Sequence, residues 1–255
     1  MPAMKITTEH EKNSLLLDTT VAFNNPWRWS VPLVAAVALL VLLALGDNVQ
    51  LFYFMNRIMS YASDGLWTHL TLLGDGQIVV LFILPFLGRR PDVVWQYVLA
   101  ALLAGSFHLN GPDLQNNAFP SGHTTAFFVL AGLVCLHRTK VWFKFAILLL
   151  AIFVGLSRIA NGVHWPVDVL GAAMGGWLVA IVAVWLAQYW RAGLNVWVQR
   201  IFALILTLVS LWAVWSLWHH YDDVYPGTHV MQVLLFVACL ALSVPGQLRL
   251  FNLKR

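Results

Sequence analysis

The sequence predicts an all-α membrane protein, a polytopic integral membrane helical bundle. Hydrophobic residues make up 60% of the chain and charged residues only 10%, and the mean hydropathy is +0.75. A soluble domain could not bury so many apolar side chains, whereas a membrane protein can expose them to lipid. The apolar residues also occur in separate runs, several of them near the lower length limit for a membrane crossing.

Eight apolar runs define the predicted membrane spans. The first six are expected to form a helical core within residues 30–190, and the last two a C-terminal transmembrane hairpin with a short tail within residues 191–255. Residues 1–29 are polar, mixed in charge and unlike a cleaved signal peptide, so they are predicted to form a cytoplasmic tail. The eight runs cover about residues 30–45, 70–87, 93–107, 124–136, 142–156, 167–187, 201–218 and 230–244.

An amphipathic helix is predicted between the first two spans, within residues 47–67. Apolar residues recur there at helical spacing, and polar residues lie between them. Such a helix could lie in the membrane interface or pack against a partner helix, and the pattern allows both. The apolar set is Leu51, Phe52, Met55, Ile58, Met59 and Ala62.

The positive charges predict the orientation of the chain. Thirteen of the fifteen lysines and arginines fall in the N-terminal tail, in alternate connections or at the C-terminus, all on one predicted side of the membrane. Cytoplasmic loops carry an excess of such residues, so this side is expected to be the inner one. Only Arg57 and Arg158 are predicted to lie outside. We therefore expect a plasma (inner) membrane protein.

The first segment that suggests chemistry is Pro120-Ser121-Gly122-His123, called the 120–123 segment below. It ends a polar stretch and begins an apolar run, so its backbone N–H groups are expected at the start of a helix. The first N–H groups of a helix have no partner within the helix, and the helix dipole adds positive charge there. This combination favours binding of an anion such as phosphate.

The second such segment, called the 157–168 segment, contains Ser157-Arg158, His164 and Asp168. Pro166 favours a helix start, so His164 is expected just before a helix and Asp168 one turn inside it. The carboxylate can then hydrogen-bond one imidazole nitrogen and leave the other free to attack phosphorus. The residues from His123 to Ser157 suffice for one crossing inward and one back, so both segments are expected at the outer face.

Together the two segments resemble the second and third signature motifs of the type 2 phosphatidic-acid phosphatase superfamily, in its membrane lipid phosphatase branch. The resemblance implies that His164 is the nucleophile, that Asp168 orients it, and that His123 protonates the leaving group. It further implies that Ser121, Gly122 and Arg158 bind the substrate phosphate. No metal or other cofactor is expected, because these groups supply the charge stabilisation that magnesium supplies in kinases.

The sequence departs from this family at the first motif, a lysine followed after six residues by Arg-Pro. The chain has no lysine or arginine between Arg90 and Arg138, where that motif normally lies. Arg90-Pro91 cannot replace it, because the predicted third span places that dipeptide at the inner face. We expect auxiliary phosphate donors in the loop before the 120–123 segment, and a further polar group near the outer end of the second span. These auxiliary residues are His108, Asn116 and Asn117 in the loop, and Asp75 in the span.

The predicted function is hydrolysis of a lipid phosphate or pyrophosphate at the outer (periplasmic or extracellular) face of the membrane. The candidate substrates include phosphatidic acid, phosphatidylglycerol phosphate, undecaprenyl pyrophosphate and lipid A phosphates. Two alternatives stay open: a phosphotransferase that uses the same residues, and a non-catalytic lipid-phosphate-binding protein that lost turnover together with the first motif. The expected partners are the lipid substrate and the bilayer, without nucleic acid, and the sequence leaves the oligomeric state undetermined.

Overall fold

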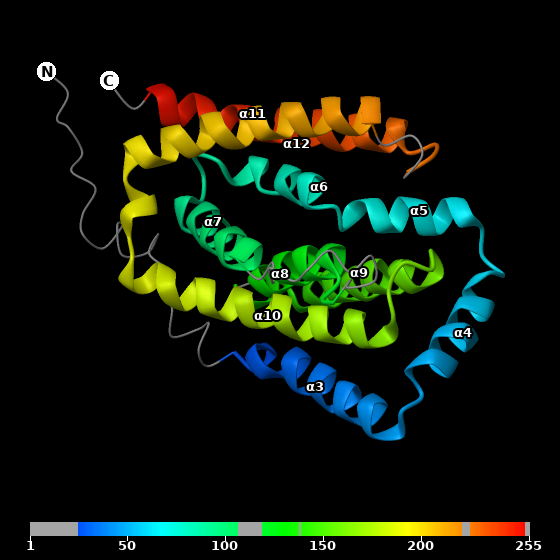
Figure 1. The fold of residues 1–255 in the computed structure, drawn as a ribbon. Helices are drawn as coiled ribbons and strands as arrows, with labels where there is room; N and C mark the ends of the chain where they lie inside the picture. The colour runs from blue at the N-terminus through cyan, green and yellow to red at the C-terminus, as the bar shows by residue number, and fades with distance from the viewer. Residues whose placement is uncertain (1–24, 107–118, 138, 221–224, 253–255) are drawn as a thin grey trace, which may run out of the picture.

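The computed structural model describes residues 25–106, 119–137, 139–220 and 225–252, and within these ranges it is all-helical (Figure 1). The predicted fold class is therefore confirmed. The helices are α3 (Trp27–Leu45), α4 (Asn48–Met59), α5 (Asp64–Leu73), α6 (Gly76–Leu81), η1 (Leu84–Phe86), α7 (Pro91–Ser106), α8 (Gly122–Leu136), α9 (Val141–Ala160), α10 (Pro166–Tyr189), η2 (Ala192–Leu194), α11 (Val196–His220) and α12 (His229–Asn252).

Helix α10 forms the centre of the bundle, and α8, α3 and α7 pack against it (Figure 1). Small residues let these helices approach closely, as is common in membrane helix pairs. A Cβ atom at Gly176 would lie 2.6 Å from the carbonyl oxygen of Thr125 in α8. Trp177 is fully buried, and its indole N–H donates to the carbonyl of Arg28 at 3.1 Å, which ties α3 to α10. The close fit sets the position of α8, whose first turn carries the 120–123 segment.

Five helices among the described residues are long and apolar enough to cross a membrane, namely α3, α9, α10, α11 and α12. Helices α7 and α8 are shorter apolar helices. The second predicted span, residues 70–87, was expected to be one run but is broken: α5 and the segment Gly76–Phe86 meet at an angle of 54°. The Asp75 side chain accepts from the N–H of Gln77 at 2.8 Å and so starts a new helix at this point.

Helix α4 accounts for most of the predicted amphipathic helix, although α5 begins before residue 67. Two polar residues of α4 contact the neighbouring helices α9 and α10. The Asn56 amide donates to the last two carbonyls of α9 at 3.0 Å each, and the Asn48 side chain accepts from an N–H of the first turn of α10 at 3.2 Å. These contacts satisfy helix-end groups that have no partner inside their own helices. Helix α4 thus braces the connection that carries His164.

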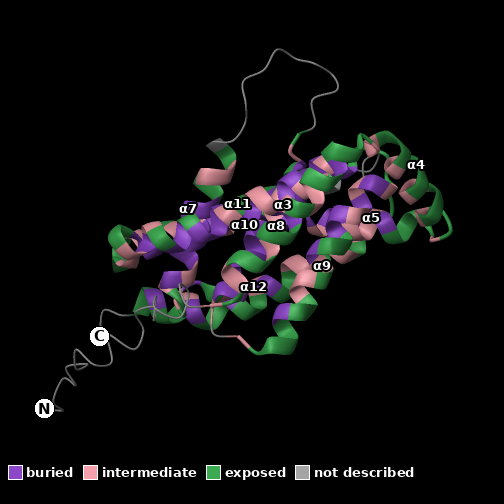
Figure 2. Ribbon diagram, turned by 90° about the horizontal axis from the view of Figure 1, so that it is seen from below, coloured by how far each residue is buried: buried purple, intermediate pink, exposed green. Residues whose placement is uncertain are grey.

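The C-terminal hairpin of α11 and α12 runs along the side of the bundle formed by α6 and η1 (Figure 1). Figure 2 colours the ribbon by burial, and exposed residues are frequent along the helices. In α11 and α12 many of the exposed residues are large and apolar. Such a surface is suited to contact with lipid acyl chains, because exposure of apolar side chains is unfavourable in water but not in the hydrocarbon core of a bilayer. Examples are Leu204, Leu208, Leu211, Leu234 and Val237.

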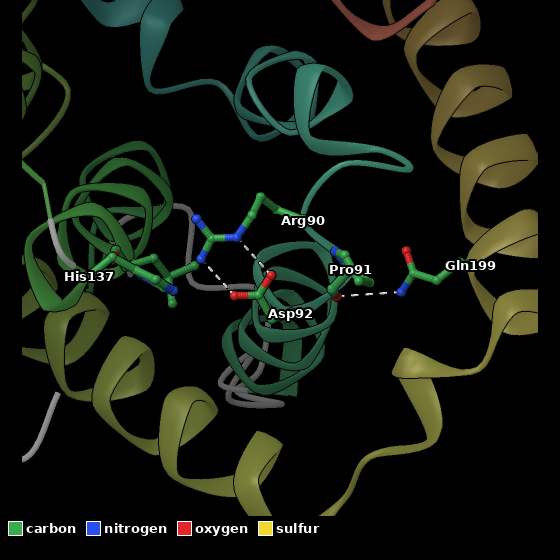
Figure 3. A network of polar contacts seen from close by, with 6 residues as sticks. Arg90, Pro91, Asp92, His137 and Gln199 are labelled. Carbon is green, nitrogen blue, oxygen red and sulfur yellow. Dashed lines mark hydrogen bonds and ion pairs between the residues drawn. The ribbon is translucent and has the colours of Figure 1, made fainter. Parts of the chain in front are cut away.

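The positive charges of Arg90 and Lys144 act on His137 at the end of α8, so both cations lie at that end of the bundle. Arg90 makes a two-pronged contact with Asp92, at 3.0 and 2.7 Å, beside His137 at the end of α8 (Figure 3). The Gln199 amide at the start of α11 donates to the Pro91 carbonyl at 3.4 Å. Because the 15 residues of α8 span about 22 Å, this cluster is far from the start of α8. Arg90-Pro91 therefore does not reach the 120–123 segment, as predicted.

Candidate active site

The 120–123 segment forms the start of α8, with Ser121 at the N-cap position. The Ser121 main chain N–H donates to the Asp168 carbonyl at 3.4 Å, which joins the two motif segments directly. The Ser121 hydroxyl is fully buried and accepts from the Thr124 hydroxyl at 3.0 Å. Gly122, by contrast, is exposed at the first helical position. Of the two residues predicted to bind phosphate, Gly122 is thus exposed at the start of α8, while the Ser121 side chain is buried against Thr124.

His164 and Asp168 lie close together, but their nitrogen–oxygen distance exceeds the upper limit of about 3.2 Å for an ordinary hydrogen bond. His164 Nδ1 is 3.5 Å from Asp168 Oδ2. The same carboxylate oxygen accepts from the N–H of Trp165 at 2.9 Å, which caps the start of α10 and holds the carboxylate toward the backbone. This distance corrects the sequence prediction. The contact of Nδ1 with Asp168 still leaves Nε2 as the nitrogen directed away from the carboxylate.

The surroundings of His164 favour a neutral imidazole. Burial lowers the pKa of His164 below the ordinary value of 6.5, and the positive charge of Arg158 lowers it further, while Asp168 opposes both effects. The side chain is 9% exposed, so water compensates little of this cost. A neutral imidazole is the form that can act as a nucleophile.

Arg158 lies in the last turn of α9, next to the loop that leads to His164. Its carbonyl accepts from the N–H groups of Val163 and His164, at 3.1 and 3.3 Å, and this closes the loop. One guanidinium nitrogen donates to the buried Thr71 hydroxyl at 2.6 Å. The charge of Arg158 acts on His164, so the cation and the imidazole share one polar region. Such a guanidinium can bind two phosphate oxygens at once.

His123 faces a pair of polar side chains from distant parts of the chain. Its Nε2 lies 2.6 Å from the Tyr225 hydroxyl and 3.8 Å from Asp75 Oδ2. The Tyr225 hydroxyl donates to the same Asp75 oxygen at 3.1 Å. Asp75 had been predicted as an auxiliary residue, whereas Tyr225 was missed because it belongs to neither motif and follows no recognisable pattern. Gly74 permits this approach, since a Cβ there would lie 3.0 Å from the His123 Cβ.

The other predicted auxiliary residues, His108, Asn116 and Asn117, lie outside the described residues. Across the described ranges, no three His, Cys, Asp or Glu side chains come together as metal ligands would. The structure thus brings together His123, Asp75 and Tyr225 on one side, and Arg158, His164 and Asp168 on the other. A main chain hydrogen bond from Ser121 to Asp168 links the two groups.

Comparison with known proteins decides the family. The model of the PAP2 superfamily matches residues 65–192, which is half of the chain and includes both motif segments. The chain belongs to the PAP2 superfamily. The resemblance predicted from the 120–123 and 157–168 segments is therefore confirmed.

Individual relatives of this PAP2 protein extend the comparison. The bacitracin transport permease protein BcrC of Bacillus licheniformis is 43% identical over 157 residues, 55% of this chain and 71% of the relative. An undecaprenyl-diphosphatase of Sulfolobus acidocaldarius is 29% identical over 162 residues, 52% of this chain and 76% of the relative. Among solved structures, the LpxE protein of Aquifex aeolicus is 27% identical, with a TM-score of 0.41, and the match covers 54% of this chain and 94% of that one.

The family and its members confirm the predicted enzyme class, a phosphatase of the hydrolase group. Together with the apolar helices they also support the predicted multi-pass membrane location. The PAP2 match ends at residue 192, so the hairpin of α11 and α12, including Tyr225, lies beyond it.

Proposed function

We propose that this PAP2 protein hydrolyses a lipid diphosphate or phosphate at the outer face of the membrane, through a phosphohistidine intermediate on His164. The observation that carries the proposal is the joining of two motif segments, more than 30 residues apart, into one polar region with Arg158, two imidazoles and the start of α8. We favour a polyprenyl diphosphate as the substrate. The support is the similarity to the relative from Sulfolobus acidocaldarius, an undecaprenyl-diphosphatase.

The proposed reaction begins with attack of His164 Nε2 on the terminal phosphorus. Asp168 lies near Nδ1 and steadies the positive charge that develops on the ring. Arg158 and the first N–H groups of α8 bind the phosphate oxygens. His123 gives a proton to the leaving oxygen as the bond to phosphorus breaks. Water then attacks the phosphohistidine, His123 takes up a proton from it, and inorganic phosphate leaves.

The direct test is phosphate release by the purified protein in detergent. Undecaprenyl diphosphate, phosphatidic acid and phosphatidylglycerol phosphate should be supplied separately, and we expect the diphosphate to be hydrolysed fastest. A lipid alcohol added in a second series would reveal a phosphotransferase, because labelled phosphate would then appear on the alcohol. Tight binding of all three lipids without phosphate release would contradict the proposal and favour the non-catalytic alternative.

The acid side of the pH profile provides a further prediction. His164 must be neutral to attack, and its pKa is lowered, so the neutral form should persist to a lower pH than for an ordinary imidazole. We therefore expect kcat/KM to decline on the acid side with an apparent pKa below 6.5. In Asp168→Asn this decline should occur at a still lower pH, since the Asp168 carboxylate is the group that raises the pKa of His164. An acid limb above pH 6.5 would contradict a lowered pKa.

Orientation in the membrane is part of the proposal. The cations at the Arg90 end of the bundle support placing that end inside, by the excess of positive charge in cytoplasmic loops. Single cysteines at Lys140 and at Gly227 mark the two ends, because Lys140 precedes α9 and Gly227 lies in the connection between α11 and α12. In intact cells, a membrane-impermeant reagent should label position 227 and not position 140. The opposite pattern would reverse the orientation.

A further inference from the structure

A hydrogen-bonded chain of three side chains links His123 to a carboxylate. The Tyr225 hydroxyl lies between the other two groups, 2.6 Å from His123 Nε2 and 3.1 Å from Asp75 Oδ2. Tyr225 is 2% exposed and Asp75 is 8% exposed, so both are held by surrounding protein. Burying such polar groups costs free energy unless they form hydrogen bonds with one another. This requirement favours the one arrangement in which the three side chains are bonded.

The arrangement determines which atoms carry protons. A tyrosine hydroxyl has one hydrogen, and Tyr225 donates it to the Asp75 carboxylate. The hydroxyl oxygen is then the acceptor in the contact with His123, so Nε2 of the imidazole must carry a hydrogen. When the imidazole is charged, the second hydrogen is on Nδ1. That hydrogen is the one left for donation to another group.

We propose that Tyr225, together with Asp75, is a positioning residue that holds His123 in the orientation and charge state of a general acid. The inference rests on the proposed function, because it assigns His123 the protonation of the leaving group. In the step, the bond from His164 Nε2 to phosphorus forms while the bond from phosphorus to the leaving oxygen breaks. The Nδ1 hydrogen of His123 passes to that oxygen, and His123 is left neutral with Nε2–H still bonded to Tyr225.

The charges around His123 explain why such support is needed. Burial disfavours a charged imidazole at His123, and the positive charge of Arg158 in α9 disfavours it further. His164, in the loop after α9, also faces His123. Asp75, between α5 and α6, is the facing carboxylate, and its Oδ2 lies 3.8 Å from Nε2. Tyr225, from the connection of α11 and α12, bridges His123 and Asp75 through its hydroxyl. The site thus contains two imidazoles, each with its own carboxylate: His164 with Asp168, and His123 with Asp75 through Tyr225.

The position of Tyr225 gives the C-terminal hairpin a role in the reaction. The match to the PAP2 superfamily covers residues 65–192, and Tyr225 lies outside it. Helix α11 packs on α6 and α12 packs on η1, and the Tyr225 hydroxyl between these two helices reaches Asp75. The hairpin therefore completes the surroundings of the general acid in this protein.

The test is Tyr225→Phe, which removes a single oxygen and keeps the aromatic ring. Phosphatidic acid has a poor alkoxide leaving group that needs a proton. On this substrate we expect kcat to fall about tenfold, because His123 stays in place and only part of the rate contribution of a general acid is lost. KM should stay within about twofold, and the alkaline limb of the pH profile should move to lower pH, because the charged imidazole loses a partner. On p-nitrophenyl phosphate, whose leaving group needs no proton, kcat should stay within about twofold.

Matched variants make the result specific. Tyr97→Phe removes the hydroxyl of another buried tyrosine, in α7, and should leave all these rates unchanged. Asp75→Asn should lower kcat on phosphatidic acid as Tyr225→Phe does, and the double variant should be no slower than the slower single one, because the two residues act through one chain of hydrogen bonds. Equal losses on both substrates, or no loss on either, would overturn the inference.

A separate measurement distinguishes failure of this inference from failure of the proposed function. If the unaltered protein releases no phosphate from any substrate, the proposed function is refuted. If it does and Tyr225→Phe matches it on both substrates, only the inference is refuted. NMR of ring-labelled histidines, with His123 assigned through His123→Gln, reports the contact without turnover. His123 should titrate at a lower pH in Tyr225→Phe, and an unchanged titration would overturn the inference.

Discussion

Replacing His164 with asparagine should reduce phosphate release by at least about 10⁴-fold, since loss of a catalytic nucleophile typically costs this much or more. Asparagine keeps a polar side chain of similar size near Asp168 but has no nitrogen that can attack phosphorus. The variant should still bind lipid diphosphate with near-normal affinity, because Arg158 and the start of α8 are unchanged. The measurement is initial rate of phosphate release under saturating substrate.

A second readout identifies the chemistry. With labelled substrate and rapid acid-free quenching, the unaltered protein should carry an acid-labile phosphoryl group that His164→Asn lacks. His219→Asn is the matched control, because His219 is an exposed histidine of α11 whose ring contacts the Trp215 carbonyl. It should retain full activity. A His164→Asn rate within tenfold of the unaltered protein would exclude His164 as the nucleophile.

Replacing Arg158 with lysine should lower kcat/KM by about 10²- to 10³-fold, even though the positive charge is kept. A guanidinium presents several N–H groups in a plane that fits two phosphate oxygens, whereas an ammonium group acts as a point charge. Arg158 is also held by the Thr71 hydroxyl at 2.6 Å, a contact set to guanidinium geometry. Because this sequence lacks the two cations of the first family motif, little other positive charge is present to compensate. Removal of one such stabilising donor in other enzymes costs a comparable factor.

The loss on Arg158→Lys should appear in both substrate affinity and turnover, since phosphate charge is present before and during the reaction. Arg191→Lys provides the control, because Arg191 is exposed at the far end of α10. Thermal unfolding of both variants should match that of the unaltered protein within a few degrees. If Arg158→Lys retained full kcat/KM, another group would have to bind the phosphate.

Several features could be predicted from the sequence because they depend on local patterns. Hydropathy and the low charge content predicted an all-helical membrane protein, since lipid requires backbone hydrogen bonds to be satisfied within helices. The spacing of His164, Pro166 and Asp168 predicted that the imidazole precedes a helix and the carboxylate lies one turn inside it. The order of the two motif segments predicted the family. In each case a few neighbouring residues contained the whole signal.

The tertiary structure decided the features that depend on contacts between distant residues. The contacts of Asn48 and Asn56 with the α9–α10 connection, and the contact of Tyr225 with His123, join residues 102 to 119 positions apart. The bend at Gly74 and Asp75 breaks a run whose hydropathy is continuous. Even the His164 to Asp168 distance depended on a competing backbone N–H. Periodicity and composition do not specify which helix faces which, because that choice is made by close packing of small residues between whole helices.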